Sequence, residues 1–394
     1  MIYLHVPFCG SFCTYCDFYS EICRSRQAFN EYADAVIAEI RDRRKELEMN
    51  MSAQDAVNTL YIGGGTPSVL PLDVLSRIVG AVSQTERLSL VTEQLSLVTE
   101  PVEVTTPTEL FDEFTVEVNP EDIVEKGREY VRGLLALGVN RISMGIQSFN
   151  DDILRWMNRR HDAGNAVKAF HILRESGVRN ISIDLIFGIS QLTDETWKDT
   201  IEKALELSPE HISAYQLSIE EGSALAKMVA DGRYVEASEE QCRRQYDILC
   251  RCLGRSSYHH YEISNFAKPG FEAVHNSAYW RRAPYIGLGP GAHSLTGNVR
   301  SWNSPELPHR SPDGSSATYS RTSETLSPED IRVERIMLSL RTDKGLKTTE
   351  LYSLTDSTVV DALLSEGALE RQGASIRIPE DHLFTSDEII RELI

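Results

Sequence analysis

Three cysteines close to the start of the chain have the types and spacing that point most directly to chemistry: Cys9, Cys13 and Cys16. A mononuclear zinc site would need a fourth Cys or His, for which His5 is the nearest candidate. A cubane 4Fe-4S cluster uses one Cys per iron, so three thiolates would leave one iron open to a further ligand. Aromatic residues lie between and beside the cysteines, namely Phe8, Phe12, Tyr15 and Phe18. The alternative is three unrelated buried cysteines; the spacing and the water-excluding aromatic residues favour a metal site instead.

A second group of candidate residues is a glycine-rich segment, Gly63-Gly64-Gly65-Thr66, that follows a predicted strand at 58–62. Glycines such as Gly64 and Gly65 let backbone groups approach a ligand closely. Thr66 can donate a hydrogen bond. An ordinary strand-to-helix turn would also contain glycine, but three in a row followed by Thr-Pro favour a ligand-binding loop.

Polar residues near the ends of further predicted strands form a third group. Glu117 lies near the end of a strand at 114–118, and Gln147 follows a strand at 141–146. Arg159 comes twelve residues after Gln147 and suits a carboxylate partner. Asp184 interrupts an apolar strand at 180–187, where an unpaired carboxylate would be costly. For Glu117 and Arg159 the alternatives to a ligand contact are a solvated charge and a structural ion pair.

The second half of the chain contains a histidine among aromatic residues, in the segment HNSAYW at 275–280. His275 can be an axial heme ligand, or a hydrogen-bonded histidine in the core. The weaker ligand candidates are His259, His260 and His293. The remaining cysteines, Cys23, Cys242, Cys250 and Cys252, receive no role, and the last three are predicted to be core or surface thiols on a helix at 238–254.

The elements that must position these residues alternate between strand and helix. Predicted strands are 58–62, 114–118, 141–146, 180–187 and 211–216, and predicted helices are 28–48, 71–82, 127–137, 162–176 and 193–206. This alternation is typical of repeated βα units with a parallel sheet. Five or six units predict an α/β fold with a partial (βα)6 barrel rather than a closed eightfold one.

The chain divides into four predicted regions, with 1–225 as the partial barrel and 226–303 completing it. Ser, Thr or Pro occupies 14 of 25 positions in 304–328, which predicts a linker or surface loop. Residues 329–394 predict a small α+β, winged-helix-like module with a two-stranded wing around Gly373. RLSLVTE at 87–93 recurs as QLSLVTE at 94–100, and we interpret 83–110 as a surface insertion, with a hairpin as one form.

Charge and hydropathy exclude some classes of protein. Lys and Arg number 40 and Asp and Glu 59, giving a net charge of −19, which argues against broad binding to nucleic acid. No apolar run reaches the roughly 18 residues of a membrane span. The first residues lack the features of a signal peptide, so a cytoplasmic location is expected, where disulfides rarely persist.

Several motifs occur in an order that resembles a known family. CxxxCxxC lies within YLHVPFCGSFCTYCDF (3–18), which is followed by YIGGGTPS (61–68), EVNP (117–120), NRISMGIQSF (140–149), DLIFG (184–188), HNSAYW (275–280) and YIGLGPGAHS (285–294). The cysteine motif resembles that of radical S-adenosylmethionine enzymes. The full set resembles the branch that contains oxygen-independent coproporphyrinogen III oxidase and the heme chaperone HemW.

The resemblance implies cofactors and residue roles. The cysteines would hold the cluster, and S-adenosylmethionine would chelate the open iron and yield a 5′-deoxyadenosyl radical on reduction. The implied S-adenosylmethionine contacts are Tyr3, Tyr15, Gly64, Gly65, Thr66, Glu117, Gln147, Arg159 and Asp184. His275 is the implied heme ligand.

Two departures from the oxidase pattern favour the chaperone. Phe18 stands where the oxidase has a further cysteine, and the chain reaches Cys9 without the oxidase's long N-terminal extension. We therefore expect a heme chaperone that carries heme as cargo to acceptor proteins and takes electrons from a donor such as a flavodoxin or ferredoxin. Homodimerisation and peripheral association with membrane partners are left open. The alternatives are decarboxylation of coproporphyrinogen III to protoporphyrinogen IX, and a zinc-binding module.

Overall fold

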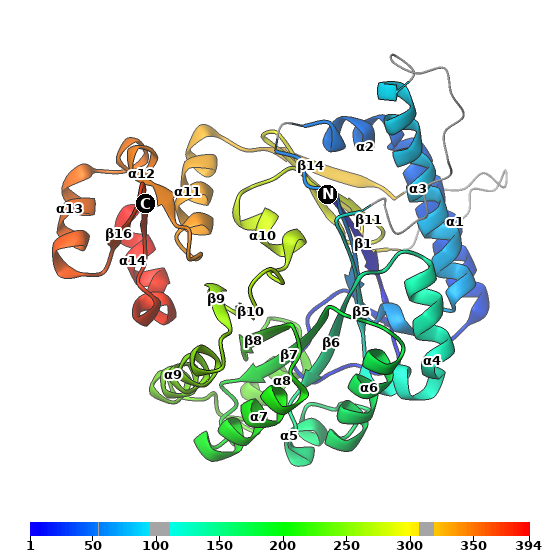
Figure 1. Cartoon of the computed structure of the whole chain (residues 1–394), viewed down its shortest axis with the longest axis horizontal. Helices are drawn as coiled ribbons and strands as arrows, with labels where there is room; N and C mark the ends of the chain where they lie inside the picture. The colour runs from blue at the N-terminus through cyan, green and yellow to red at the C-terminus, as the bar shows by residue number, and fades with distance from the viewer. Residues whose placement is uncertain (54, 95–110, 307–318) are drawn as a thin grey trace.

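A nine-stranded sheet is the centre of the computed structural model, which describes residues 1–53, 55–94, 111–306 and 319–394 (Figure 1). Seven strands are parallel and in spatial order they are β11 (Ile286–Leu288), β1 (Ile2–Val6), β4 (Thr59–Gly64), β5 (Glu113–Val118), β6 (Arg141–Gln147), β7 (Ile181–Phe187) and β8 (His211–Gln216). Antiparallel β10 (Asn265–Ala267) and β9 (His259–Glu262) extend the sheet beyond β8. β11 and β9 are its two edges, so the predicted α/β partial barrel is confirmed as an open sheet.

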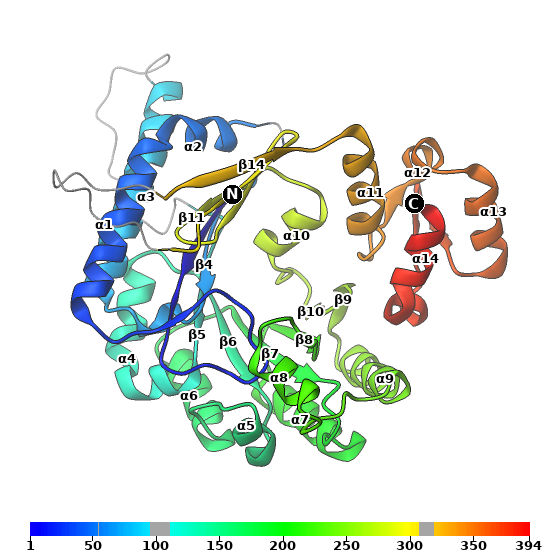
Figure 2. The ribbon, with the colours of Figure 1, turned by 180° about the vertical axis from the view of Figure 1, so that it is seen from behind.

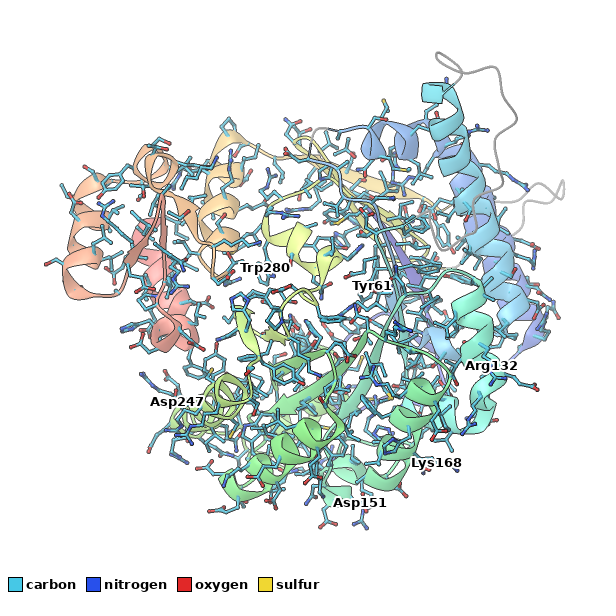
Figure 3. All side chains as sticks on the ribbon, in the orientation of Figure 1. Tyr61, Arg132, Asp151, Lys168, Asp247 and Trp280 are labelled. Atoms are coloured by element: carbon cyan, nitrogen blue, oxygen red, sulfur yellow. The ribbon has the colours of Figure 1, made fainter. Side chains whose placement is uncertain are left out.

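Helices follow the parallel strands and cover the outer face of the sheet (Figures 1 and 2). They are α1 (Arg26–Asp42), α2 (Arg44–Met51), α3 (Leu72–Gln94), α4 (Pro120–Ala136), α5 (Asp151–Trp156), α6 (Ala163–Glu175), α7 (Asp194–Leu207), α8 (Ala224–Ala230) and α9 (Glu239–Arg255). In Figure 3 Arg132, Lys168 and Asp247 project outward from helices, whereas Tyr61 lies inside. Charged groups thus remain in solvent while the strands are buried.

Two predicted helices have different bounds from those expected. The segment predicted as one helix at 28–48 is two, α1 and α2, which join at Arg43. The buried guanidinium of Arg43 bonds Glu39, the carbonyl of Gly287 and Ser294 at 2.6–3.0 Å, and so ties this junction to β11. α4 begins at Pro120 rather than 127, because proline favours the first helical turn. Gly127 interrupts it with φ +66°.

The two irregular stretches contain more regular structure than the sequence predicted. α3 extends to Gln94, so the first repeat copy at 87–93 is helical rather than a hairpin. Apart from Gln94, the second copy lies outside the described residues. Part of 304–328 is a strand, β14 (Arg321–Thr325), which pairs with β13 (Val299–Asn303), itself paired with β12 (His293–Thr296). Thr322 and Thr325 favour an exposed edge strand, although Ser/Thr content had predicted a loop.

The C-terminal residues form a separate group of elements beside the sheet, orange to red in Figure 1. Its helices are α11 (Pro328–Ser339), α12 (Thr348–Leu354), α13 (Ser357–Glu366) and α14 (Ser386–Leu393), with a 3-10 helix, η3 (Glu380–Thr385). The expected wing is β16 (Glu370–Gln372) and β17 (Ser375–Arg377), turning at Gly373, where φ is +59°. A third strand, β15 (Leu346–Lys347), pairs with β17.

Candidate functional site

The cysteine segment leaves β1 and crosses the carboxyl ends of the parallel strands (Figure 2). Backbone hydrogen bonds fix Thr14 to the Met157 carbonyl, at 3.1 Å, and to the Leu225 amide, at 2.8 Å. The Asn158 side chain donates to the Phe12 carbonyl at 2.7 Å. The loop is therefore held by elements of the distant half of the sheet.

A cavity of about 550 Å³ lies beneath this loop and receives all three cysteines. It is also lined by eight of the residues expected to contact S-adenosylmethionine: Tyr15, Gly64, Gly65, Thr66, Glu117, Gln147, Arg159 and Asp184. Most of these residues come from the loop or from the ends and interiors of β4 to β7, where parallel α/β folds place their working groups, whereas Arg159 lies between α5 and α6. We call this the cysteine cavity.

The thiols of the cysteine cavity lie among hydrogen-bond donors. Thr66 Oγ1 donates to Cys9 Sγ at 3.5 Å, and Arg159 Nη1 donates to Cys13 Sγ at 3.3 Å. Burial raises the pKa of Cys9, and raises the pKa of Cys16 to about 11. Metal binding to these sulfurs would therefore release protons, as thiolate ligation does generally.

Arg159 connects the cysteines to the strand ends. Its Nη2 donates to Asn119 Oδ1 at 2.6 Å and to the Gly145 carbonyl at 2.7 Å, and Asn119 in turn donates to Thr66 at 3.0 Å. Arg159 Nε is buried and has no hydrogen-bond partner among the described residues. A buried guanidinium with an unused donor suits an anionic ligand group such as a carboxylate.

The backbone conformation and packing of the glycine segment require glycine at positions 64 and 65. Gly64 has φ +107°, and its amide donates to Glu117 Oε2 at 3.1 Å. A Cβ on Gly65 would lie 2.7 Å from the Phe8 carbonyl oxygen and 3.1 Å from Cys9 Sγ. The backbone here packs against the cysteine loop more closely than any side chain would permit.

Two partly buried carboxyl groups, Glu117 and Asp184, line the same cavity. Burial raises the pKa of Glu117 to about 7, despite a 2.7 Å hydrogen bond from Tyr61. Burial also raises the pKa of Asp184 to about 6, despite a 3.2 Å hydrogen bond from Ser143. A cationic or hydroxyl-bearing ligand would stabilise their charged forms.

The sequence of β6 alternates between cavity-lining and apolar residues, a pattern that would have predicted further cavity residues. Arg141, Ser143, Gly145 and Gln147 occur at every second position and line the cavity, while the residues between them are apolar. This period of two assigns one polar and one apolar face to the strand. At its end the pairing with β7 shifts register, and Gln147 adopts φ +69°, a strained conformation for a non-glycine residue. Sequence reasoning selected only Gln147.

A second cavity, of about 380 Å³, adjoins the first and shares Asp17 and Phe18 with it. Its other lining residues are Tyr3, His5, Tyr19, Tyr279, Tyr285, Gly291, Ala292 and His293. Tyr3 therefore lies in this second cavity and not in the cysteine cavity where the resemblance had placed it. We call it the tyrosine cavity.

Two histidines near these cavities have both ring nitrogens engaged. His5 contacts Tyr3 Oη at 3.1 Å and the Tyr19 carbonyl at 2.9 Å, and it lies outside the cysteine cavity lining, so it does not complete a zinc site with the cysteines. His275 is buried against Thr59 Oγ1 at 2.8 Å and Tyr279 Oη at 3.1 Å. A heme-ligand role would require the His275 ring to leave both hydroxyl partners.

His293 differs from both, since it is exposed and has no side-chain hydrogen bond to the described residues. Its ring stacks on Trp302 with centroids 5.7 Å apart. Partial burial of the ring and the nearby Arg300 lower the pKa of His293, which favours the neutral imidazole with an available lone pair.

The cysteine cavity fits a cluster with a zwitterionic cofactor. Three sulfurs from one loop suit a 4Fe-4S cluster with one iron open to a further ligand. The unpartnered Arg159 Nε suits the carboxylate of an amino acid moiety, and the two carboxyl groups with raised pKa values suit its amine. A model of the Radical SAM superfamily matches residues 3–204. "Heme chaperone HemW" of Lactococcus lactis is 33% identical over 345 residues, covering 87% of this chain and 82% of the relative.

The chain belongs to the radical SAM superfamily, in its HemW branch. The Bacillus subtilis HemW is also 33% identical, over 346 residues that cover 87% of this chain and 84% of that protein. Coproporphyrinogen III oxidase (HemN) from Escherichia coli superposes with a TM-score of 0.75 at 22% identity, covering 99% of this chain and 89% of that one. That similarity establishes the fold. Within the described residues, no helix combines the length and hydropathy needed to cross a bilayer.

Proposed function

We propose that this chain is a heme chaperone that holds a 4Fe-4S cluster through Cys9, Cys13 and Cys16, binds S-adenosylmethionine, and passes heme to acceptor proteins. The names of the curated HemW relatives support this proposal. The observation that carries it is the adjacency of the two cavities, one rich in charge and sulfur and the other in phenol and imidazole, across the wall formed by Asp17 and Phe18.

The cysteine cavity would hold the cluster and S-adenosylmethionine. Arg159 would neutralise the cofactor's carboxylate, and Glu117 and Asp184 would accept hydrogen bonds from its amine or ribose hydroxyls. The cluster and cofactor supply one-electron chemistry when bound and reduced. The residues of this chain contribute charge balance and the exclusion of water.

Heme would bind in the tyrosine cavity with His293 as the axial ligand. Histidine and tyrosine are both known axial ligands of heme iron, and aromatic rings pack well on a macrocycle. His293 fits better than His275 because its ring nitrogens are free of hydrogen bonds to the described residues, while those of His275 are engaged. An exposed ligand also suits a protein that must release its cargo.

Phe18 would be a residue that distinguishes the chaperone from the oxidase. Its side chain is 63% exposed and lies in the wall shared by both cavities, at the position where the oxidase motif carries a thiol. A phenyl ring offers a stacking surface for a tetrapyrrole but cannot take part in thiol chemistry.

The test uses anaerobically reconstituted full-length protein in two assays. With hemin, we expect a Soret-absorbing complex that survives gel filtration and loses its heme to an added apo-globin. With coproporphyrinogen III, S-adenosylmethionine and a reductant, we expect no protoporphyrinogen IX. Formation of that product without retention of heme would replace the chaperone proposal with the oxidase.

A further inference from the structure

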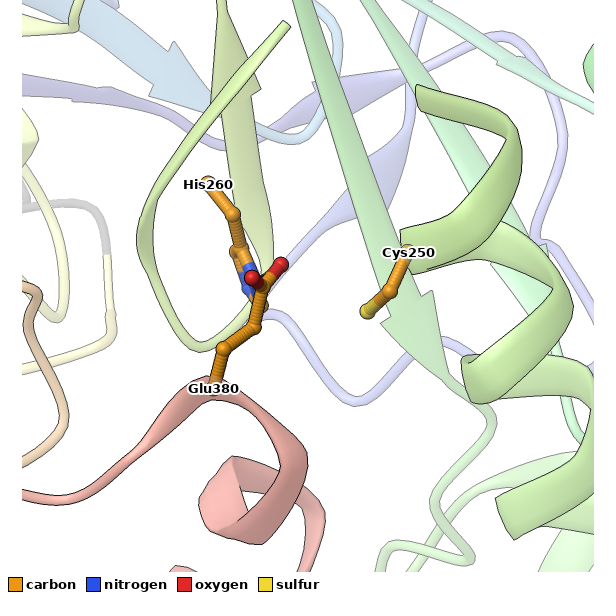
Figure 4. A group of neighbouring side chains, drawn as sticks. All are labelled: Cys250, His260 and Glu380. Carbon is orange, nitrogen blue, oxygen red and sulfur yellow. Dashed lines mark hydrogen bonds and ion pairs between the residues drawn. The ribbon is translucent and has the colours of Figure 1, made fainter. Parts of the chain in front are cut away.

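A cluster of three metal-binding side chains shares no residue with the lining of either cavity. Cys250 on α9, His260 on β9 and Glu380 on η3 each place a ligand atom within 4.8 Å of the other two (Figure 4). The three residues span 130 positions of sequence (380 − 250). The spacing of cysteines along one helix therefore could not reveal the ligand partners of Cys250.

Both ring nitrogens of His260 have polar neighbours, and one of these neighbours is a carboxylate. Tyr246 Oη donates its one proton to the Ile263 carbonyl at 3.0 Å, and His260 Nε2 lies 3.3 Å from the same Oη. His260 Nδ1 lies 3.1 Å from Glu380 Oε1, so this contact holds either a proton on Nδ1 or a cation shared by the two atoms.

The types of the three ligand atoms and the fixed orientation of the His260 ring favour a cation. His260 is stacked on Phe266, with ring centroids 4.1 Å apart and 14° between planes, so the imidazole is already oriented. Adjacent ligand atoms of a tetrahedral zinc site lie about 3.3 Å apart, given metal–ligand bonds of about 2.0–2.1 Å. The 3.1 Å separation of Nδ1 and Oε1 matches one edge of such a site.

We propose that Cys250, His260 and Glu380 bind one zinc ion, with a water molecule in the fourth position. Thiolate, imidazole and carboxylate together are a typical ligand set for zinc. Burial raises the pKa of the Cys250 thiol to about 12, and zinc would deprotonate it on binding.

The zinc ion would attach the C-terminal module to the edge of the sheet. Cys250 and His260 belong to the sheet region, whereas Glu380 lies on η3 of the C-terminal group. Contacts already present at this junction include Phe384 against Tyr246, with ring centroids 5.5 Å apart, and a backbone hydrogen bond from the Ile263 amide to the Arg341 carbonyl at 3.0 Å. Zinc would add a link across the same junction.

The test measures zinc and iron in full-length protein with its cluster reconstituted. We expect about one zinc per chain in the wild type. We expect less than a fifth of that in Cys250→Ser and Glu380→Gln, with iron unchanged. Cys252→Ser is the matched control, because Cys252 lies on the same helix outside the group and should leave zinc unchanged. Glu380 is 59% exposed as a side chain, so its replacement tests the site without disturbing the core.

A second readout is cobalt substitution. Added Co²⁺ should give the wild type a thiolate-to-cobalt charge-transfer band that Cys250→Ser lacks and Cys252→Ser retains. Equal zinc contents in all four proteins, or a cobalt spectrum unaffected by Cys250→Ser, would overturn the proposal and leave an imidazolium–carboxylate pair at this position.

Discussion

The two cavities share a wall but differ in chemistry. The cysteine cavity is lined by three thiols together with several arginine and carboxyl side chains, among them Arg159, Glu117 and Asp184. The tyrosine cavity is lined by Tyr3, His5, Tyr279, Tyr285 and His293 and takes residues from both ends of the sequence. A charged cavity selects a small polar cofactor, whereas phenol and imidazole rings select a flat aromatic ligand. This division predicts that mutations should affect the two ligands separately.

The largest effect is expected from removing the thiols. Replacement of Cys9, Cys13 and Cys16 together by Ala should reduce reconstituted iron and sulfide from about four each per chain to near zero. Replacement of Cys23, Cys242 and Cys252 should leave both unchanged. Quantitative iron and labile-sulfide analysis measures this effect, and an unchanged iron content in the triple N-terminal variant would remove the basis for the cysteine cavity.

Arg159→Lys should weaken S-adenosylmethionine binding by about tenfold to a hundredfold, because lysine cannot reproduce the fork that joins Cys13, Asn119 and a ligand carboxylate. Arg155→Lys, four residues earlier and exposed on α5, is the control and should bind normally. Equilibrium dialysis on the reconstituted protein measures the affinity. Equal affinities for the two variants would show that Arg159 does not contact the cofactor.

His293→Ala should weaken hemin binding by about tenfold, the loss of one axial bond, while S-adenosylmethionine binding stays unchanged. His171→Ala, on the exposed face of α6, should leave both ligands unaffected. Soret titrations measure the difference. If His275→Ala lost heme and His293→Ala did not, heme would have to be assigned to the HNSAYW segment.

Glu117→Gln should stabilise the ligand-free protein at pH 7–8 by roughly 2 kcal/mol, because the pKa of Glu117 is raised to about 7. A raised carboxyl pKa means that the folded state binds the proton more tightly than the unfolded state. The wild type therefore loses stability as pH rises from about 4.5 to 7, and the variant should not.

Glu121→Gln provides a control of opposite sign to Glu117→Gln. Contacts with His161, Arg159 and Arg160 lower the pKa of Glu121 to about 2, so its charge stabilises the fold above the unfolded pKa. This variant should be less stable than the wild type at neutral pH and approach it below pH 4. Chemical unfolding across pH 2–8 measures both variants. Parallel pH profiles for the two variants would contradict the assigned directions.

The cysteine cavity was largely predictable because its chemistry is local. Three cysteines lie within eight residues, and Gly64, Glu117 and Asp184 stand at or near strand ends or interrupt apolar strands, where their types are unexpected. Five of the seven parallel strands, β4 to β8, followed from alternating strand and helix patterns, whereas β1 was not among the predicted strands. β11 and β14 were not predicted, because short edge strands contain too few residues to show a clear alternation of apolar and polar side chains.

The tyrosine cavity and the Cys250 group were not predictable for the opposite reason. Tyr3 and His293 meet because β1 and β11 pair, which places the start of the chain beside residues nearly three hundred positions later. His275 matched an aromatic motif, but only the structure shows that hydroxyl groups of Thr59 and Tyr279 occupy both ring nitrogens. Long-range pairing, rather than local composition, decides which side chains line a cavity.

The central claim is that the cysteine cavity holds a cluster with one iron open to S-adenosylmethionine. Electron paramagnetic resonance of the reduced, reconstituted protein tests it most directly, with spectra recorded before and after S-adenosylmethionine is added. We predict that the g values of the cluster change on addition, and that they change less at the same cofactor concentration in Arg159→Lys. Identical wild-type spectra with and without the cofactor would contradict the claim.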